Sequence, residues 1–368
     1  MSQPDDYTTG AGEEIASRKA DHLDLCATDD VAFREATTLL EQVTLVHDAL
    51  PELALADIDP STEIVGHTLR APVVIAAMTG GVDRAERVNK DLASVAQELG
   101  IAFGFGSMRP LLEHGIRKGY EVRDVAPDAL VLGNLGVVQA RKASNQQLAD
   151  LVGSTGIDAL CVHLNPAMEV IQPDGDDDFR GGVETIARLV EHLGVPVIVK
   201  ETGCGLSRHV GTRLVELGVR WVDVSGAGGT SWVGVETLRA KARTRALGDR
   251  FWDWGIPTAG SVAQLSGLGL GVIATGGVRH GLDIARAIAL GAVAGGLARP
   301  FLMAWNAGGR PAALAEGAQI IDEIRVAMLL TGSRTPSDLR RRPVVLGPDL
   351  ERWVPADSPL RRKTPGQK

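Results

Sequence analysis

Eight short apolar runs, separated by amphipathic stretches, constrain the fold of this chain more than any other feature. Each run is almost continuously hydrophobic, which is typical of parallel strands that are buried on both faces. Stretches such as 86–100 and 281–291 have helical periodicity and end in Gly, the preferred residue after a helix C-terminus. Strict strand–helix alternation predicts either a closed barrel or a doubly wound open sheet. The apolar runs are residues 72–78, 101–107, 129–136, 159–165, 196–203, 221–228, 271–277 and 292–300.

The polar residues of these runs favour the barrel. Each run gathers Gly, Ser, Thr, Asn, His or Lys at its C-terminal end, and barrel enzymes build their sites at that face from many strands. An open sheet would need such residues only beside its switch point, and no GxGxxG motif follows the first run. The sequence therefore predicts an α/β fold, a (β/α)8 TIM barrel.

The predicted barrel covers residues 72–345 and is preceded by an extension, 1–71. In this extension we expect a helix around 13–25, followed by irregular chain to about residue 60. Two short strands, 63–65 and 67–70, are expected to form a hairpin that closes the barrel floor.

Two later segments do not belong to the strand–helix repeat. The insertion 231–257 carries three tryptophans. It is equally consistent with a lid over the site and with a loop that only packs against the rest of the protein. The C-terminal segment 346–368 is expected to be partly disordered, especially over the polar tail 356–368.

Charge and cysteine content argue against several kinds of partner. The net charge of −8 argues against a general affinity for nucleic acid or anionic membranes, so phosphate binding must come from local groups. The widely spaced Cys26, Cys161 and Cys204 indicate a reducing compartment rather than a disulfide framework. The N-terminus is polar and acidic, unlike a signal peptide, and no apolar run reaches 18 residues. We predict a cytoplasmic protein without a membrane span or a nucleic-acid partner.

Glycine turns after the seventh and eighth runs predict a phosphate site. Gly276 and Gly277 would let the backbone approach phosphate oxygens, and Arg279 or Arg299 would add charge. TIM barrels frequently bind phosphate with the loops after these two strands, through backbone N–H groups and a helix N-terminus. The alternative is that the glycines only make tight turns. We favour phosphate binding because the turns occur at the right two strands.

Other strand ends carry groups suited to a flavin ring. The segment 78–81 offers a thin, backbone-rich surface, and Asn134 and Ser107 are able to hydrogen-bond ring edges. Lys200 ends an apolar strand, where an unpaired charge is costly. It would place positive charge beside the ring and favour the anionic reduced flavin, or it forms a structural ion pair. The residues alone predict a barrel that binds a phosphate-bearing cofactor, and FMN is the best candidate.

Three further motifs are ambiguous on the residues alone. Arg18 and His22 share one face of the predicted N-terminal helix, which by itself fits a solvated surface. His163 and Asn165 point the same way from a strand end, because the side-chain period of a strand is two. The acidic run 176–178 resembles a calcium loop but lacks the required glutamate, so we predict solvated loop charges.

In chain order, the motifs resemble those of the type 2 isopentenyl-diphosphate isomerase family over roughly residues 15–345. The resemblance implies a step of isoprenoid biosynthesis on reduced FMN with Mg²⁺, and NADPH as the reductant. The double bond of isopentenyl diphosphate would move to give dimethylallyl diphosphate by proton addition and removal. A homo-oligomer, a tetramer or larger, is also implied. The matching segments are RKADH (18–22), MTGG (78–81), GSMR (106–109), NLG (134–136), HLNPAME (163–169), PDGDDDFRG (173–181), KETGCGLS (200–207), SGAGGTSW (225–232), WGIPT (254–258), ATGGVR (274–279) and GLARPFL (296–302).

The resemblance also implies roles for individual residues. Glu169 is expected to bind Mg²⁺ that bridges to the substrate diphosphate. The residues expected at the reacting centre are Lys200, His163, Asn165 and Met168. The residues expected at the substrate diphosphate are Arg18, Lys19, His22, Ser107, Met108 and Arg109. The residues expected at FMN are Met78, Thr79, Gly80, Ser107, Asn134, Lys200, Ser225, Thr230, Gly277, Val278, Arg279, Ala298 and Arg299.

Two methionines depart from the family pattern. Met168 stands where the family usually carries the glutamine of HLNxxQE, and Met108 stands where GSQR has its glutamine. A thioether is at best a weak acceptor and does not transfer protons, so we expect a more apolar pocket and a weaker proton relay. Two hypotheses stay open. The chain is an ordinary isomerase, or it is a divergent paralogue with different non-redox chemistry or a longer prenyl substrate.

Other functions fit the sequence less well. An FMN-dependent 2-hydroxyacid oxidoreductase would need a His base and an Arg clamp after the sixth run, where this chain has SGAGGTS (225–231). An enzyme resembling IMP dehydrogenase would need a nucleophilic cysteine in that loop, which has none. A non-catalytic binding protein is the alternative if Met168 marks lost activity.

Overall fold

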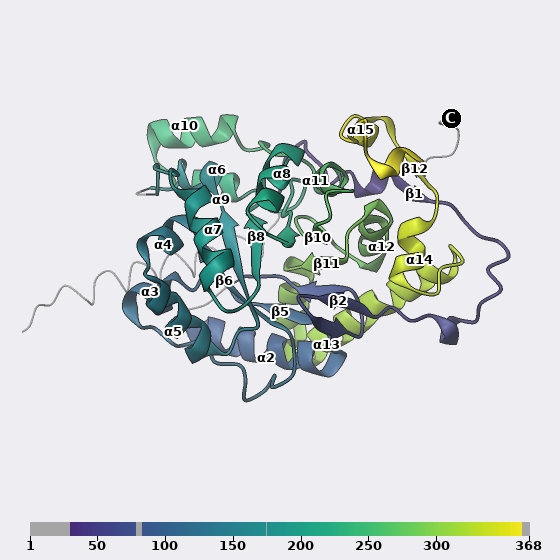
Figure 1. Cartoon of the computed structure of the whole chain (residues 1–368), viewed down its shortest axis with the longest axis horizontal. Coiled ribbons are helices and arrows are strands. Elements are labelled where there is room, and N and C mark those ends of the chain that lie inside the picture. Colours follow the sequence, from purple (N-terminus) through teal and green to yellow (C-terminus); the bar gives the residue numbers. More distant parts are fainter. Residues whose placement is uncertain (1–29, 79–82, 174, 363–368) are drawn as a thin grey trace, which may run out of the picture.

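The eight apolar runs form one closed barrel (Figure 1). The computed structural model describes residues 30–78, 83–173 and 175–362. All strand pairs around the barrel are parallel, in the order β10-β11-β4-β5-β6-β7-β8-β9. The predicted TIM barrel is therefore confirmed. The strands are β4 (Val73–Ile75), β5 (Ala102–Gly104), β6 (Val131–Gly136), β7 (Ala159–Leu164), β8 (Val197–Glu201), β9 (Trp221–Asp223), β10 (Gly271–Ala274) and β11 (Ala294–Leu297).

Amphipathic helices connect the strands and cover the barrel. The helix α5 shows how local sequence sets their ends: Ser144 and its partner Gln147 form a capping box, and Gly156 ends the helix in the left-handed region. The apolar faces of these helices pack on the outside of the strands in one continuous core. The connecting helices are α2 (Asp83–Leu99), α3 (Arg109–His114), α4 (Val137–Lys142), α5 (Asn145–Thr155), α6 (Pro166–Glu169), α7 (Gly182–His192), α8 (Arg208–Glu216), α11 (Thr258–Leu265), α12 (Gly281–Leu290) and α13 (Arg299–Leu329).

A hairpin closes the N-terminal end of the barrel, as predicted. Its strands, β2 (Thr62–Ile64) and β3 (His67–Leu69), pair antiparallel. Ile64 and Leu69 are buried in the same apolar cluster as side chains that begin barrel strands, such as Ala102, Ala159 and Ala294. This apolar plug leaves the opposite, C-terminal end of the barrel for polar chemistry.

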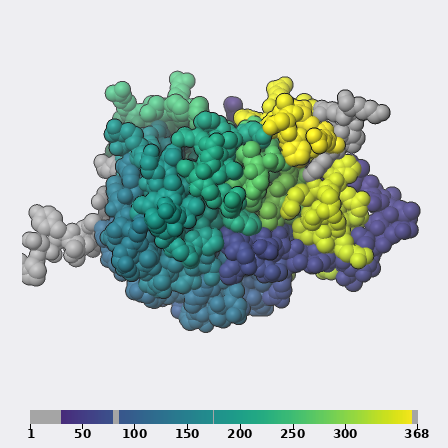
Figure 2. All heavy atoms as spheres, in the orientation of Figure 1, coloured from purple at the N-terminus to yellow at the C-terminus, as the bar shows by residue number. Residues whose placement is uncertain are grey.

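The segment before the hairpin is more regular than predicted. β1 (Val43–Leu45) pairs antiparallel with β12 (Val344–Leu346), and two short 3-10 turns, η1 (Leu40–Gln42) and η2 (Leu55–Asp57), flank it. Figure 2 shows the purple N-terminal segment and the yellow C-terminal segment meeting on one side of the molecule. The prediction of irregular chain is wrong here, because three-residue strands are too short to show an alternating pattern.

The predicted disorder of the C-terminal tail is wrong for residues 356–362. The chain continues through α14 (Pro336–Arg341) and α15 (Pro348–Glu351) into η3 (Pro359–Arg362). Leu360 is fully buried in the main core, which outweighs the polar composition of the tail. The helix predicted around 13–25 and the last residues, 363–368, lie outside the described residues. None of the described helices is long and apolar enough to span a membrane.

The insertion after β9 forms two helices, α9 (Trp232–Arg239) and α10 (Ala242–Arg250). Trp252 follows them and is buried; its indole Nε1 donates to the carbonyl oxygen of Ala32 at 2.9 Å. The guanidinium of Arg34 lies over the Trp252 ring at 3.8 Å from its centroid. Of the two interpretations of this insertion, these contacts support packing against the N-terminal segment.

Candidate active site

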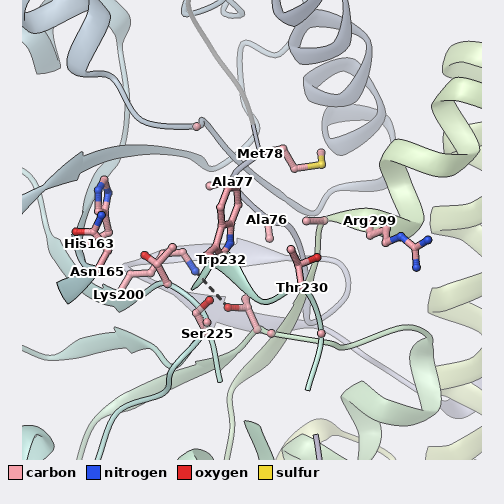
Figure 3. Close-up of a pocket in the computed structure, with 18 of the residues that line it drawn as sticks. Ala76, Ala77, Met78, His163, Asn165, Lys200, Ser225, Thr230, Trp232 and Arg299 are labelled. Carbon is pink, nitrogen blue, oxygen red and sulfur yellow. Dashed lines mark hydrogen bonds between the residues drawn. The ribbon is translucent and has the colours of Figure 1, made fainter. Parts of the chain in front are cut away.

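A single cavity of about 500 Å³ at the C-terminal ends of the strands collects most of the predicted site residues (Figure 3). Its size is typical of cofactor and ligand pockets. The structure thus brings together side chains from every part of the barrel. The predicted residues that line it are Met78, Ser107, Arg109, Asn134, His163, Asn165, Met168, Glu169, Lys200, Ser225, Thr230, Gly277, Val278, Arg279, Ala298 and Arg299. Arg18, Lys19, His22, Thr79 and Gly80 lie outside the described residues.

One wall of the cavity is made of glycine backbone. The loop after β9 and the loop after β10 touch each other, so that a Cβ atom on Gly229 would collide with the backbone of Gly277. Gly276 has a φ of 94°, and a Cβ atom there would collide with the backbone of Gly226. No other residue fits these positions without a shift of the backbone. We call the lining residues Gly229, Gly276 and Gly277, together with Gly226 and Gly228 that pack against them, the glycine wall.

The two turns predicted to bind phosphate lie at this side of the cavity. β10 and β11 are neighbours in the barrel, and Val278 and Ala298, which follow them, both line the cavity. Arg299 begins the long helix α13, and Arg279 follows the glycine pair with an exposed side chain. Backbone N–H groups, a helix N-terminus and two arginine residues therefore line this side of the cavity, and such groups bind anions in proteins.

Lys200 is paired and also lines the cavity. Its Nζ lies 2.8 Å from Oδ2 of Asp223 and 3.3 Å from Oγ1 of Thr275. Both charged side chains are almost completely buried. The sequence allowed two alternatives for Lys200, a functional lysine or a structural ion pair. In the structure Lys200 forms an ion pair and also lines the cavity, so the two alternatives do not exclude each other.

His163 is held as a neutral imidazole. Burial, with a smaller contribution from the charge of Lys200, lowers the pKa of His163 to about 4. Its Nδ1 lies 2.9 Å from Oδ1 of Asn134. A neutral ring facing a carbonyl oxygen carries its proton on that nitrogen, which leaves Nε2 as an acceptor.

Glu169 is fixed by neutral donors at the opposite side of the cavity. Asn165, the residue that precedes α6, donates its side-chain Nδ2 to Oε1 at 2.7 Å. The backbone N–H of Asp176 donates to Oε2 at 3.0 Å, and Nε2 of Gln172 lies 3.5 Å from the same oxygen. We call the cavity-lining side chains Asn134, His163, Asn165, Met168, Glu169 and Gln172 the side-chain wall.

A divalent cation at Glu169 would need ligands from a bound molecule. Among the described residues, no group of three or more His, Cys, Asp or Glu side chains could hold a metal ion. Mg²⁺ often takes one or two carboxylates and completes its shell with water and phosphate oxygens. The donor set at Glu169 fits that kind of site.

Two sequence predictions in this region are corrected. Met108, expected at the substrate diphosphate, is fully buried in the core, where its Sδ accepts the Asn134 N–H at 3.4 Å. It faces the adjacent strand β6 rather than the cavity. Asp176, expected to be a solvated loop charge, is paired with Nε2 of Gln139 at 2.9 Å and with Lys142 at 3.3 Å.

Several lining residues were not predicted as site residues. Thr275 and Trp232 belong to motifs that the sequence had singled out, and Trp232 projects into the cavity from the start of α9 (Figure 3). Asp223, which does not line the cavity itself, lies beside Lys200 on the next strand and can be found only from the strand register. Thr202 likewise lies in such a motif, KETGCGLS. Three polar or thioether side chains of the lining come from outside the motifs and carried no signal in the sequence: Gln139, Gln172 and Met303.

Solved structures share this architecture. A mandelate oxidase variant with an FMN adduct aligns with a TM-score of 0.64 at 21% sequence identity, over 93% of this chain and 100% of that chain. A flavocytochrome b2 variant with bound sulfite gives a TM-score of 0.64 at 22% identity, over 92% of this chain and 84% of the other. At such low identity these likenesses establish the barrel fold alone.

Sequence relatives are much closer. A sequence model of the FMN-dependent dehydrogenase family matches residues 11–169 and 167–346. An isopentenyl-diphosphate delta-isomerase of Synechococcus sp. is 46% identical over 93% of this chain and 99% of its own length. The same-named protein of Halobacterium salinarum is 46% identical over 93% and 96%, and that of Methanothermobacter thermautotrophicus is 43% identical over 92% and 96%. The chain belongs to the FMN-dependent dehydrogenase family and, within it, to the type 2 isopentenyl-diphosphate delta-isomerases.

Proposed function

We propose that this chain interconverts isopentenyl diphosphate and dimethylallyl diphosphate with reduced FMN and Mg²⁺. The observation that carries the proposal is a cavity with two separate places for anions. The glycine wall with Arg279 and Arg299 suits a cofactor phosphate, and Glu169 across the cavity suits a metal-bound diphosphate. The relatives at 46% identity are named for this isomerisation and align over nearly their whole length.

The residues fit FMN at the glycine wall. Backbone groups of Gly277, Val278 and Ala298 would surround its phosphate, while Lys200 and Asn134 would meet the ring further into the cavity. When bound and reduced, FMN supplies an electron-rich ring that can exchange a proton with the substrate carbon. The part of this chain is to bind the ring, to hold charge beside it and to keep water away.

The substrate diphosphate is proposed to lie at the side-chain wall. The carboxylate of Glu169, held by Asn165 and the Asp176 N–H, would bind Mg²⁺ and through it the diphosphate. Arg109, whose Nε donates to Glu113 at 2.7 Å, and Ser107 also line the cavity and would add donors. His163 would offer Nε2 as a neutral acceptor rather than a positive charge, because of its low pKa.

Met168 is the residue on which the two candidate functions, an ordinary isomerase and a paralogue with a longer prenyl substrate, differ. It lines the cavity one residue before Glu169, where it cannot relay a proton. In an ordinary isomerase, proton transfer then depends on the bound ring and ordered water. The second candidate, a paralogue that takes a longer prenyl diphosphate, is favoured by the presence of three methionines in the cavity lining, Met78, Met168 and Met303.

The test is an anaerobic assay of the purified protein with FMN, Mg²⁺ and isopentenyl diphosphate, after reduction by NADPH or dithionite. We expect dimethylallyl diphosphate to form only with reduced FMN, and to stop when a chelator removes Mg²⁺. Protein that binds reduced FMN but forms no product from this substrate would rule out the ordinary isomerase. Geranyl and farnesyl diphosphates in the same assay test the second candidate.

Three finer parts of the proposal need separate measurements. NADPH as the reductant predicts bleaching of the bound flavin absorbance when NADPH is added without oxygen. A homo-oligomer of four or more chains predicts the corresponding mass in light scattering. The cytoplasmic location rests on the widely spaced cysteines alone, and fractionation of the source cells would test it.

A further inference from the structure

A buried carboxylate lies behind the lysine of the cavity. Asp223 is 7% exposed and Lys200 is 8% exposed, and the two are register partners on the adjacent strands β8 and β9. Lys200 lines the cavity, whereas Asp223 is not among its lining residues. The carboxylate would therefore act on a bound ring through its neighbours Lys200 and Thr275, which both line the cavity.

The strand register explains this arrangement. Two residues earlier on β8 and β10, Ile198 and Ile273 lie in the apolar cluster inside the barrel. Because the side-chain period of a strand is two, Lys200 and Thr275 also point inward, one layer closer to the cavity. Asp223 lies between them on β9. Lys200, Asp223 and Thr275 together form a polar layer inside the barrel, next to its C-terminal opening.

The hydrogen bonds of this layer fix the direction of the ammonium group. Asp223 accepts from Lys200 at 2.8 Å, from the backbone N–H of Ser225 at 3.2 Å, and from the hydroxyl of Thr275. Since the Thr275 hydroxyl donates to the carboxylate, its oxygen accepts from Lys200 at 3.3 Å. Two of the three N–H groups of the ammonium are thus used behind the cavity. In Figure 3 the Lys200 side chain extends toward the middle of the cavity, below Trp232.

We propose that Asp223 is a positioning residue that keeps the ammonium group of Lys200 aimed into the cavity, where the lysine stabilises the anionic form of reduced FMN. This inference rests on the proposed function for the presence of FMN. A lone ammonium in so buried a place would turn away towards water, because its desolvation would be uncompensated. With the carboxylate behind it, the ammonium group keeps its place next to the ring.

The variant Asp223→Asn tests this role, because it keeps the shape of the side chain and removes its charge. The readout is the midpoint potential of protein-bound FMN without substrate, together with the affinities for oxidised and reduced FMN. We expect the preference for reduced FMN to fall at least tenfold, which lowers a two-electron midpoint by about 30 mV. Lys200→Met should lower it at least as far.

A neighbouring carboxyl group provides the matched control. Glu201 is as buried as Asp223 but bonds to the backbone N–H groups of Cys204 and Gly205, away from the cavity. Glu201→Gln should leave the midpoint unchanged. If Asp223→Asn does not fold, Thr275→Val removes only the hydroxyl that joins the two charges, and a smaller shift of the same sign is expected.

The outcomes separate this inference from the proposed function. Folded Asp223→Asn protein that binds FMN with an unchanged or raised midpoint would overturn the inference alone. Wild-type protein that binds no FMN would overturn both. Wild-type protein that binds FMN but lacks isomerase activity would remove the proposed function, and the potentials would still decide the role of Asp223.

Discussion

The two walls of the cavity are built on different principles. The glycine wall consists of backbone segments in contact, where the added Cβ of any other residue would meet main-chain atoms. The side-chain wall consists of polar groups that hold one another, such as Asn165 with Glu169 and Asn134 with His163. A substitution in the glycine wall would therefore distort the backbone, whereas a single substitution in the side-chain wall can change the polar groups that face the cavity and leave the backbone in place. We therefore expect the glycine wall to determine whether a phosphate-bearing cofactor binds, and the side-chain wall to determine the reaction.

The largest effect is expected from a methyl group on the glycine wall. In Gly276→Ala the new Cβ would collide with the Gly226 backbone, and the φ of 94° is strained for alanine. We expect loss of bound FMN and a stability loss of at least about 1–3 kcal/mol, the usual cost of such strain. Flavin absorbance after gel filtration and denaturant unfolding measure the two effects.

A matched control for this prediction is Gly153→Ala. Gly153 lies in α5 with no atoms near its added Cβ and with an exposed surface. Alanine in a helix interior should raise stability by about 0.5–1 kcal/mol and leave FMN bound. Normal FMN binding by Gly276→Ala would contradict the distinction between the two walls.

The next effect concerns the charge on the side-chain wall. Glu169→Gln keeps an acceptor for the Asn165 side chain and removes the negative charge. We expect isomerase activity to fall by about two to three orders of magnitude, since a metal that stabilises transition-state charge contributes several kcal/mol. FMN binding should be unchanged, and the Mg²⁺ needed for half-maximal activity should rise. Asp178→Asn, a surface charge paired with Arg180, is the control and should have full activity.

A smaller effect is expected at Met168. Met168→Gln introduces an amide able to join a proton relay, so we expect kcat to rise about tenfold, below the usual range of a well-placed proton carrier. KM and FMN affinity should change little. Initial rates with isopentenyl diphosphate decide this. An unchanged kcat would show that position 168 takes no part in proton transfer and would favour the longer prenyl substrate.

The smallest effect on function, although a measurable effect on stability, is a pH dependence caused by His163. Its pKa is about 4 in the folded protein and about 6.5 when unfolded. Between these values the unfolded chain binds the extra proton, so stability falls as pH falls from 6.5 to 4. We expect His163→Gln to lack this loss, a difference of about 1–3 kcal/mol because the ring partly faces the cavity.

Comparing the free energy of unfolding of the wild type with that of His163→Gln isolates the contribution of this histidine. Burial raises the pKa of Glu201 to about 8, which makes stability fall as pH rises from about 4.5 to 8. This opposite pH dependence of the free energy of unfolding is present in both the wild type and His163→Gln, so it cancels when one profile is subtracted from the other. Equal pH profiles of the free energy of unfolding would contradict the neutral, buried state assigned to His163.

Sequence reasoning succeeded where one residue type has few structural uses. The alternation of apolar runs and helices allowed few folds, and Gly276 and Gly277 lie in the turn and at the cavity that their position predicted. It failed for Met108, because the motif gave its place in the chain but not the direction of its side chain. It also missed Gln139 and Gln172, whose types fit any solvated helix or loop.

By itself the sequence determined the barrel, its floor hairpin and the face that carries the polar residues, because periodicity and glycine turns act over a few neighbouring residues. Only the tertiary structure decided which partner neutralises Lys200, what holds Glu169, and that β1 pairs with β12. The Lys200 pair joins residues 23 positions apart, and the β1–β12 pairs join residues 299 to 303 positions apart (344 − 45 and 346 − 43). The donors to Glu169 are only three to seven residues away, but the folded loop decides which of them face it. Burial then determines how strongly the polar side chains of the site interact, because a charge or an imidazole enclosed by protein has lost its contact with water.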